Sequence, residues 1–230
     1  MSLNVEFCVM SLKLIVTKDG SHTIQGAGGI TYHSTFGALQ ESMHIFITAG
    51  LRAIANRNPV RIFELGLGTG LNAFLSLLES ADTGRAVSYE VVETTPLPIP
   101  TIHELNYCRQ LGRPESADLF ERLHTSPWET PNILHPAFTF FKTRRSAGGY
   151  LLRQPADLVY YDAFDPVVQP ELWTTGRFER LYHQLAPGAL LVTYSCKGAV
   201  QRALNAVGFQ LEKRPGPPGK REMLRARKPI

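Results

Sequence analysis

The sequence predicts an α/β fold in which a mostly parallel sheet ends in an antiparallel hairpin. From residue 60 onward, short apolar strands alternate with amphipathic helices, and this order builds a parallel sheet buried on both faces. The last two predicted strands, 209–214 and 222–228, lie on either side of a Pro- and Gly-rich loop, which indicates an antiparallel pair. With 230 residues, 43% of them hydrophobic, the chain is long enough to bury one substantial core.

The first 58 residues are predicted to form an extension that precedes the alternating region. Residues 13–17 and 22–25 read as the two strands of a hairpin, because the turn sequence KDGS lies between them. Apolar residues at helical spacing then predict one helix through residues 34–58, which ends before Pro59. We therefore divide the chain into an extension, 1–58, and a sheet domain, 59–230, which together form one compact unit.

Seven strands and five helices are predicted for the sheet domain. Besides the hairpin, the predicted strands are 60–65, 86–93, 137–141, 157–162 and 189–195. The predicted helices are 71–80, 102–111, 115–123, 170–188 and 197–208, the last of them capped by Gly208.

Composition limits the kinds of function that the chain can have. The net charge of +4 is mildly basic, which is compatible with a polyanionic partner without establishing one. Cys8, Cys108 and Cys196 form no CxxC pair and the histidines form no HExxH motif, so we predict neither a disulfide framework nor a metal site. No signal peptide or apolar stretch of membrane-spanning length is present, and we expect a cytoplasmic protein.

The loop ELGLGTG, residues 64–70, follows the first strand of the sheet domain and opens a helix. Its glycines let the backbone turn sharply and approach a ligand closely. Leu71 stands where the dinucleotide-binding fingerprint needs a small residue, and the GK[ST] ending of a phosphate-binding loop is missing. An acid followed by three alternating glycines is typical of binding to S-adenosylmethionine (SAM). The alternative is a tight turn that binds nothing.

Acidic residues lie at the ends of two of the predicted strands, 86–93 and 157–162. Glu90 and Glu93 are candidates for binding the ribose hydroxyls, with Glu93 nearer the strand end, and either is alternatively a surface acid. Ligands of parallel sheets bind beyond the carboxyl ends of the strands, so Asp162 should converge on the same crevice. A partly buried carboxylate there can orient an amine and accept its proton, whereas Asp165, next to Pro166, favours a turn. A helix cap is the alternative for Asp162.

Four segments together resemble a known family: FELGLGTGLN, YYDAFDP, LVTYSCKGAVQRAL and PGPPGKREM. They are similar to the methyltransferase domain of the MnmC family of tRNA wobble-uridine modification, and to its single-domain versions in particular. The resemblance covers most of the chain and implies a class I SAM-dependent methyltransferase (Rossmann-like). Its implied reaction is N-methylation of the 5-aminomethyl group on the wobble (2-thio)uridine, with SAM as cofactor and tRNA as partner. Because the sequence ends at Ile230, no flavin chemistry is expected.

The resemblance also implies a set of site residues, with Asp162 as the catalytic residue. Those implied to contact SAM are Glu64, Gly66, Gly68, Gly70, Asn72, Glu93 and Glu41. Those considered for the substrate are Gln40, Phe164, Trp173, Lys197, Lys220 and Arg221, although Trp173 more often packs in a core and basic residues often form only a solvated face. The segment FFKTRRSAGG offers no acid after the third strand, which leaves a backbone carbonyl to accept from the adenine amino group.

Two other classes of function remain open from the sequence. A methyl- or aminopropyltransferase that acts on a small free amine would use the same loop and aspartate without tRNA. A Rossmann-like module that binds a nucleoside cofactor for a scaffolding role would catalyse nothing. Salt-sensitive tRNA binding distinguishes the first alternative, and methyl incorporation from labelled SAM distinguishes the second. The sequence leaves the oligomeric state open.

Overall fold

The computed structural model describes residues 12–230, so the predictions that concern residues 1–11, including Cys8, lie outside it. Its main sheet has eight strands in the order β5-β6-β4-β3-β7-β8-β10-β9. The parallel strands are β3 (Val60–Leu65), β4 (Val87–Val92), β6 (Phe138–Thr143), β7 (Ala156–Tyr161) and β8 (Leu185–Thr193). The hairpin strands β9 (Gln210–Pro215) and β10 (Glu222–Arg227) pair antiparallel, and β10 also runs antiparallel to β8. The predicted fold class is confirmed.

The eighth strand was not predicted. It is β5 (Asn132–His135), which pairs antiparallel with β6 at the edge of the sheet. Among its four residues only Leu134 is buried, so the strand has no apolar pattern that a sequence reading can detect.

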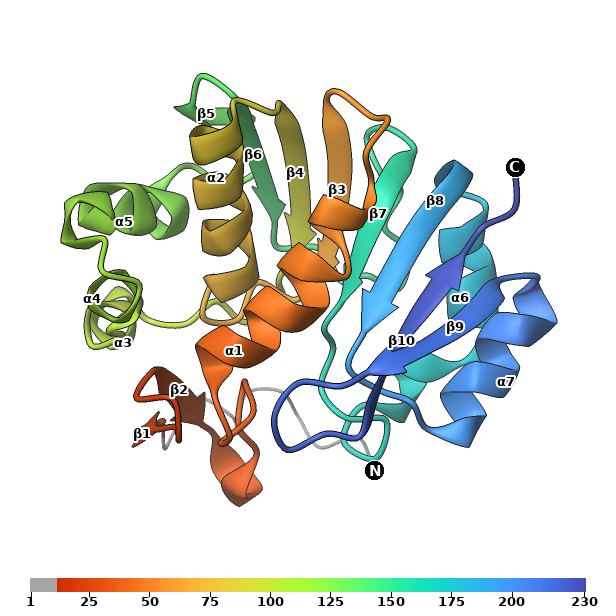
Figure 1. Cartoon of the computed structure of the whole chain (residues 1–230), viewed down its shortest axis with the longest axis horizontal. Coiled ribbons are helices and arrows are strands. Elements are labelled where there is room, and N and C mark those ends of the chain that lie inside the picture. The colour runs from red at the N-terminus through yellow and green to blue at the C-terminus, as the bar shows by residue number, and fades with distance from the viewer. Residues whose placement is uncertain (1–11) are drawn as a thin grey trace.

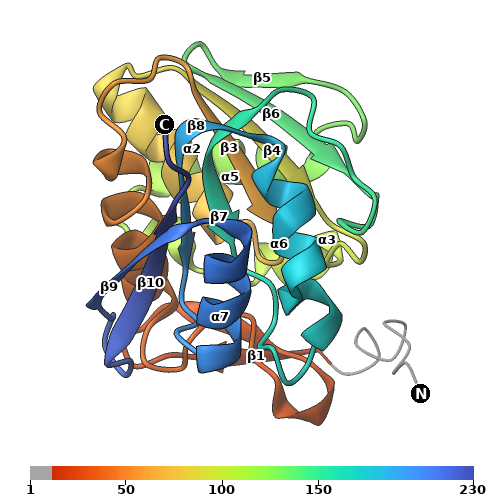
Figure 2. The same ribbon diagram turned by 90° about the vertical axis from the view of Figure 1, so that its right-hand side faces the viewer.

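Helices cover both faces of the sheet (Figures 1 and 2). One face carries α1 (Ala38–Ser42) and α2 (Leu71–Thr83), and the other carries α6 (Thr175–Tyr182) and α7 (Gly198–Val207). As predicted, α7 ends at Gly208, whose φ is 103°. The shorter helices are α3 (Ile99–His103), α4 (Tyr107–Gln110), η5 (Pro114–Ser116), α5 (Ala117–Thr125) and η6 (Pro170–Trp173).

The extension packs against the same core as the sheet. Its strands β1 (Lys13–Val16) and β2 (His22–Gln25) form the predicted hairpin, which η2 (Ala27–Gly29) follows. The predicted 34–58 helix is wrong in length. After α1 the chain continues as the π-helical segment η3 (Met43–Thr48), and the non-helical φ of −103° and ψ of −89° at Gly50 then separate it from the short turn η4 (Leu51–Ala53).

Phe46 of η3 illustrates how the extension joins the sheet. Its ring lies 5.1 Å from that of Tyr160 on β7, and both side chains are buried in one cluster. The division at residue 58 stays a prediction. Within residues 12–230, no helix is both long and apolar enough to cross a membrane.

Candidate active site

Three sequence-predicted groups meet at the carboxyl ends of the central strands. Strand β3 lies between β4 and β7, so the chain order reverses here, and ligands of open α/β sheets bind at such a point. The glycine loop follows β3, Glu93 follows β4 and Asp162 follows β7, which places them along one edge of the sheet, at the bottom in Figure 1. Their roles in binding and catalysis stay predictions.

The glycine loop has a backbone that only glycine adopts readily. Gly66, Gly68 and Gly70 have φ values of 89°, 51° and 74°. At Gly70 an added Cβ would lie 2.5 Å from Nε2 of His124, so the loop is also packed too closely for a side chain. At Gly66 the nearest atom to such a Cβ is the Asp162 carbonyl oxygen at 3.9 Å, which leaves the backbone open beside Asp162. This cradle fits a ligand that approaches the main chain.

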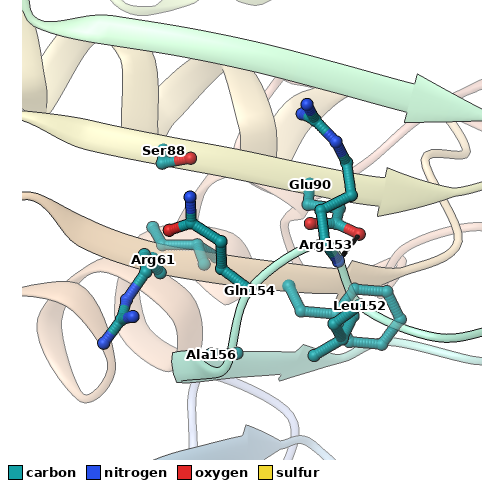
Figure 3. A pocket seen from close by; sticks show the side chains of 9 residues that line it. Arg61, Ser88, Glu90, Leu152, Arg153, Gln154 and Ala156 are labelled. Atoms are coloured by element: carbon teal, nitrogen blue, oxygen red, sulfur yellow. Dashed lines mark hydrogen bonds between the residues drawn. The ribbon is translucent and has the colours of Figure 1, made fainter. Parts of the chain in front are cut away.

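Glu93 is oriented toward this loop, and Glu90 is not. Glu93 accepts hydrogen bonds from the backbone N–H groups of Gly68, at 3.0 Å, and Thr95, at 2.8 Å. An ionised carboxylate has about four acceptor sites, so two remain for the ribose hydroxyls. Glu90 instead accepts from the Tyr150 hydroxyl at 2.6 Å. It lines a polar pocket against the middle of β3 and β4 (Figure 3). Of the two candidates, only Glu93 borders the crevice.

A buried hydrogen-bonded network forms the floor of the crevice. The Asn72 side-chain amide donates to Glu64 at 2.9 Å and to Asp162 at 2.8 Å, and the Tyr89 hydroxyl donates to Glu64 at 2.8 Å. Glu64 is only 1% exposed, and its burial raises its pKa well above the usual range. The hydrogen bonds from Asn72 and Tyr89 occupy both carboxyl oxygens of Glu64. Glu64 positions Asn72, and Asn72 in turn positions Asp162.

Asp162 is half-buried at the end of β7. Burial raises the pKa of its carboxyl to about 7, and the negative charge of Glu41 acts in the same direction. The Asn72 hydrogen bond and the positive charge of Lys220 oppose this shift. A carboxyl group that titrates near neutral pH can both hydrogen-bond an amine and accept its proton, which suits a general base.

Glu41, Lys220 and Tyr194 form a wall beside Asp162. Lys220 lies 2.8 Å from the Glu41 carboxylate, which is 6% exposed, and its Nζ sits 3.9 Å from the centroid of the Tyr194 ring. The Tyr194 hydroxyl donates to the Ala163 carbonyl at 2.9 Å. Tyr194 was not among the predicted site residues, although it directly follows β8 at this same edge of the sheet.

The other predicted substrate residues have different surroundings. Trp173 is 5% exposed, and its indole N–H donates to the Phe164 carbonyl at 2.9 Å, so it packs as core. Lys197 pairs with Asp165 at 2.5 Å, and Asp165 also accepts from the Val167 N–H at 2.8 Å within a turn. Gln40 and Arg221 are exposed on the surface.

The extension supplies a further side of the crevice that the sequence did not reveal. The Tyr32 ring contacts the Phe164 ring edge-on at 5.2 Å, and it lies 3.0 Å from where a Cβ would stand on Gly68. His33 Nε2 lies 2.6 Å from the Thr69 hydroxyl oxygen, and burial lowers the pKa of His33 to about 4. No local pattern identifies these residues, because only tertiary packing brings residues 32–33 to the loop. Across residues 12–230, no group of three or more His, Cys, Asp or Glu side chains is placed to hold a metal.

Comparison with known proteins agrees with this architecture. Residues 149–229 match the profile of a family of S-adenosyl-L-methionine-dependent methyltransferases. A tRNA 5-methylaminomethyl-2-thiouridine biosynthesis bifunctional protein MnmC, from Aromatoleum aromaticum, is 35% identical over 94% of this chain and 35% of its own length. The chain spans about a third of the length of the curated relatives it matches.

Two solved structures share the fold. MnmC2 from Aquifex aeolicus superposes with a TM-score of 0.73 at 24% identity, over 96% of this chain and 72% of the other. Spermidine synthase from Thermotoga maritima superposes with a TM-score of 0.52 at 14% identity, over 97% and 74%. The fold and the family match define a class I SAM-dependent methyltransferase. More narrowly, the chain is similar over 94% of its length to the MnmC relative and shares the fold of MnmC2.

Proposed function

We propose that this methyltransferase acts on tRNA and methylates the 5-aminomethyl group of the wobble (2-thio)uridine, giving 5-methylaminomethyl-2-thiouridine. The observation that carries the proposal is the Asp162 carboxyl, with a pKa of about 7, beside the open backbone of the glycine loop. The name of the Aromatoleum relative, which refers to biosynthesis of this nucleoside, supports the choice of substrate.

In the proposed reaction, some residues of the crevice bind the cofactor and Asp162 accepts the proton. Bound SAM supplies a methyl group on a sulfonium, and the nitrogen that receives it must present a lone pair and lose a proton. Glu93 binds the ribose hydroxyls, and the glycine loop contacts the cofactor through its main chain. Asp162 accepts a hydrogen bond from the amine, orients its lone pair and takes the proton. Positioning of the two reactants contributes the larger part of the acceleration.

The direct test is incubation of the protein with SAM and tRNA from a strain that lacks this methylation, followed by nucleoside mass spectrometry. We expect the 5-aminomethyl nucleoside to be converted to its methylaminomethyl form. A matched Asp162→Asn variant should bind S-adenosylhomocysteine normally and leave the nucleoside unmethylated. If wild-type protein leaves the aminomethyl nucleoside unchanged while it binds SAM, the proposed substrate is wrong.

The same preparation distinguishes the rival that uses a small free amine. Putrescine and spermidine are offered in place of tRNA with labelled SAM as the methyl donor, and separately with labelled decarboxylated SAM as the aminopropyl donor, and we expect no label to be transferred. Binding to tRNA should weaken steeply with added salt, because each phosphate contact releases counterions. Label on the polyamine, with tRNA binding absent at low salt, would favour the small-amine enzyme instead.

A further inference from the structure

Glu129 has an unusual backbone conformation beside the cofactor crevice. It lies between α5 and β5, and with a φ of 59° it is the one non-glycine residue in the range 12–230 with positive φ. That conformation costs energy in any residue with a side chain and is uncommon outside glycine and asparagine. Residues held this way by the surrounding fold cluster at ligand-binding sites, so the position calls for a functional explanation.

The contacts of Glu129 fix its carboxylate at the carboxyl end of β6. Its Oε1 accepts a hydrogen bond from the Thr143 hydroxyl at 2.6 Å and another from the Arg144 N–H at 3.0 Å. Its own N–H donates to the Lys142 carbonyl at 2.9 Å. The hydrogen bond from the Thr143 hydroxyl is the main cause that lowers the pKa of Glu129. Burial acts against it, while the Arg144 N–H and the charge of Arg145 lower the pKa further, so the exposed side chain is an ionised acceptor.

One residue links this carboxylate to the proposed ribose-binding acid. The Glu93 N–H donates to the Thr143 carbonyl at 2.9 Å, while the Thr143 hydroxyl donates to Glu129. In an adenosyl ligand the sulfur and the base leave the ribose at opposite ends. The strand order β6-β4-β3-β7 puts Asp162, where the sulfonium must lie, on one side of Glu93 and Glu129 on the other. A base attached to a ribose at Glu93 therefore points toward the end of β6.

We propose that Glu129 accepts a hydrogen bond from the exocyclic amino group of the cofactor's adenine and so selects adenine over bases that carry oxygen there. The segment after β6 has no acid of its own, and Glu129 brings one to the same strand end from a different part of the chain. This assignment replaces the backbone carbonyl expected from the sequence. It rests on SAM binding in this crevice and not on the identity of the methyl acceptor.

The test compares binding of S-adenosylhomocysteine with binding of its analogue in which hypoxanthine replaces adenine, both measured by titration calorimetry. Wild-type protein should prefer the adenine ligand by about tenfold to one-hundredfold, because a carbonyl oxygen would face the Glu129 carboxylate. Glu129→Gly suits the positive φ, so the fold should survive. In this variant the preference should fall at least about tenfold.

Two further variants separate recognition from a structural effect. Thr143→Val removes the hydroxyl that holds Glu129 and should reduce the preference in the same direction by a smaller factor. Glu121→Gln, on the exposed face of α5 where it pairs with His103 at 3.6 Å, should leave the preference unchanged. General damage to the crevice would weaken both ligands equally and keep their ratio. An unchanged ratio in Glu129→Gly, or a wild-type protein that binds both ligands alike, overturns the proposal, and neither result depends on tRNA.

Discussion

Two aspartates three residues apart, Asp162 on the floor of the crevice and Asp165 at its rim, have pKa values shifted in opposite directions. On the floor, burial raises the pKa of Asp162 to about 7. Three residues further along, Asp165 and its partner Lys197 form the exposed rim of the crevice. Burial also raises the pKa of Asp165, but the hydrogen bonds from Lys197 and the Val167 N–H, with the charges of Lys197 and Lys220, together outweigh it and lower the pKa. Desolvation disfavours a charge, and a nearby cation favours it. Reactivity here therefore depends on the surroundings of a carboxylate rather than on its place in the sequence motif.

The largest expected effect comes from removing the floor carboxylate. Asp162→Asn should lower the rate of methyl transfer by about 10²–10⁴-fold, the usual contribution of a general base. Affinity for S-adenosylhomocysteine should stay close to that of the wild type. Single-turnover kinetics and calorimetry measure the two quantities separately.

The rate should also depend on pH through this residue. Asp162 acts as a base only when it is ionised, so the wild-type rate should rise with pH through a midpoint of about 7, and Asp162→Asn should lack that step. Asp165→Asn is the matched control and should keep it. Wild-type turnover in Asp162→Asn would remove Asp162 from the mechanism.

The sequence predicted the floor better than the walls, for a physical reason. In a parallel sheet the strand ends share one edge, so spacing alone placed the glycine loop, Glu93 and Asp162 together. Tyr32 and Glu129 reach the crevice from segments that no strand-end rule positions. The strand β5 escaped prediction because only one of its residues is buried, and the first helix ended early at Gly50. Tertiary contacts determine these features.

Substitutions of Trp173 test whether this residue, considered for the substrate from the sequence, belongs to the substrate site or to the core. Its ring packs 5.0 Å from that of Tyr161, and the side chain is 5% exposed. Trp173→Ala should lower the free energy of unfolding by about 3–5 kcal/mol, as expected for a buried aromatic residue. Trp173→Phe keeps an aromatic ring but loses the hydrogen bond to the Phe164 carbonyl and part of the buried indole, and should cost about 1–3 kcal/mol. Urea unfolding measures both free energies. A Trp173→Ala variant that is as stable as the wild type but no longer methylates tRNA would show that Trp173 contacts the substrate.

On the floor of the crevice, the side-chain amide of Asn72 donates hydrogen bonds to two carboxyl groups, those of Glu64 and Asp162. Asn72→Ala should lower the free energy of unfolding by about 1–3 kcal/mol, because Glu64 loses a buried donor. The hydrogen bond from Asn72 lowers the pKa of Asp162, so its loss should move the midpoint of the pH–rate profile above about 7. Chemical denaturation and the pH profile test the two effects independently. A midpoint that stays in place would show that Asn72 does not tune Asp162.

The two lysines compare the wall and the rim directly, and the smallest effect on stability should come from Lys197. Lys220→Met leaves the 6%-exposed Glu41 without its cation and should lower the free energy of unfolding by about 1–3 kcal/mol. The pair of Lys197 and Asp165 is exposed on both sides, so Lys197→Met should cost less than about 1 kcal/mol, and salt should screen even that. Urea unfolding at low and high salt measures these differences. If Lys197 holds a tRNA phosphate, its loss should reduce the salt slope of tRNA binding by about one without affecting stability. A larger loss of stability for Lys197→Met than for Lys220→Met would contradict the distinction between a desolvated wall and a solvated rim.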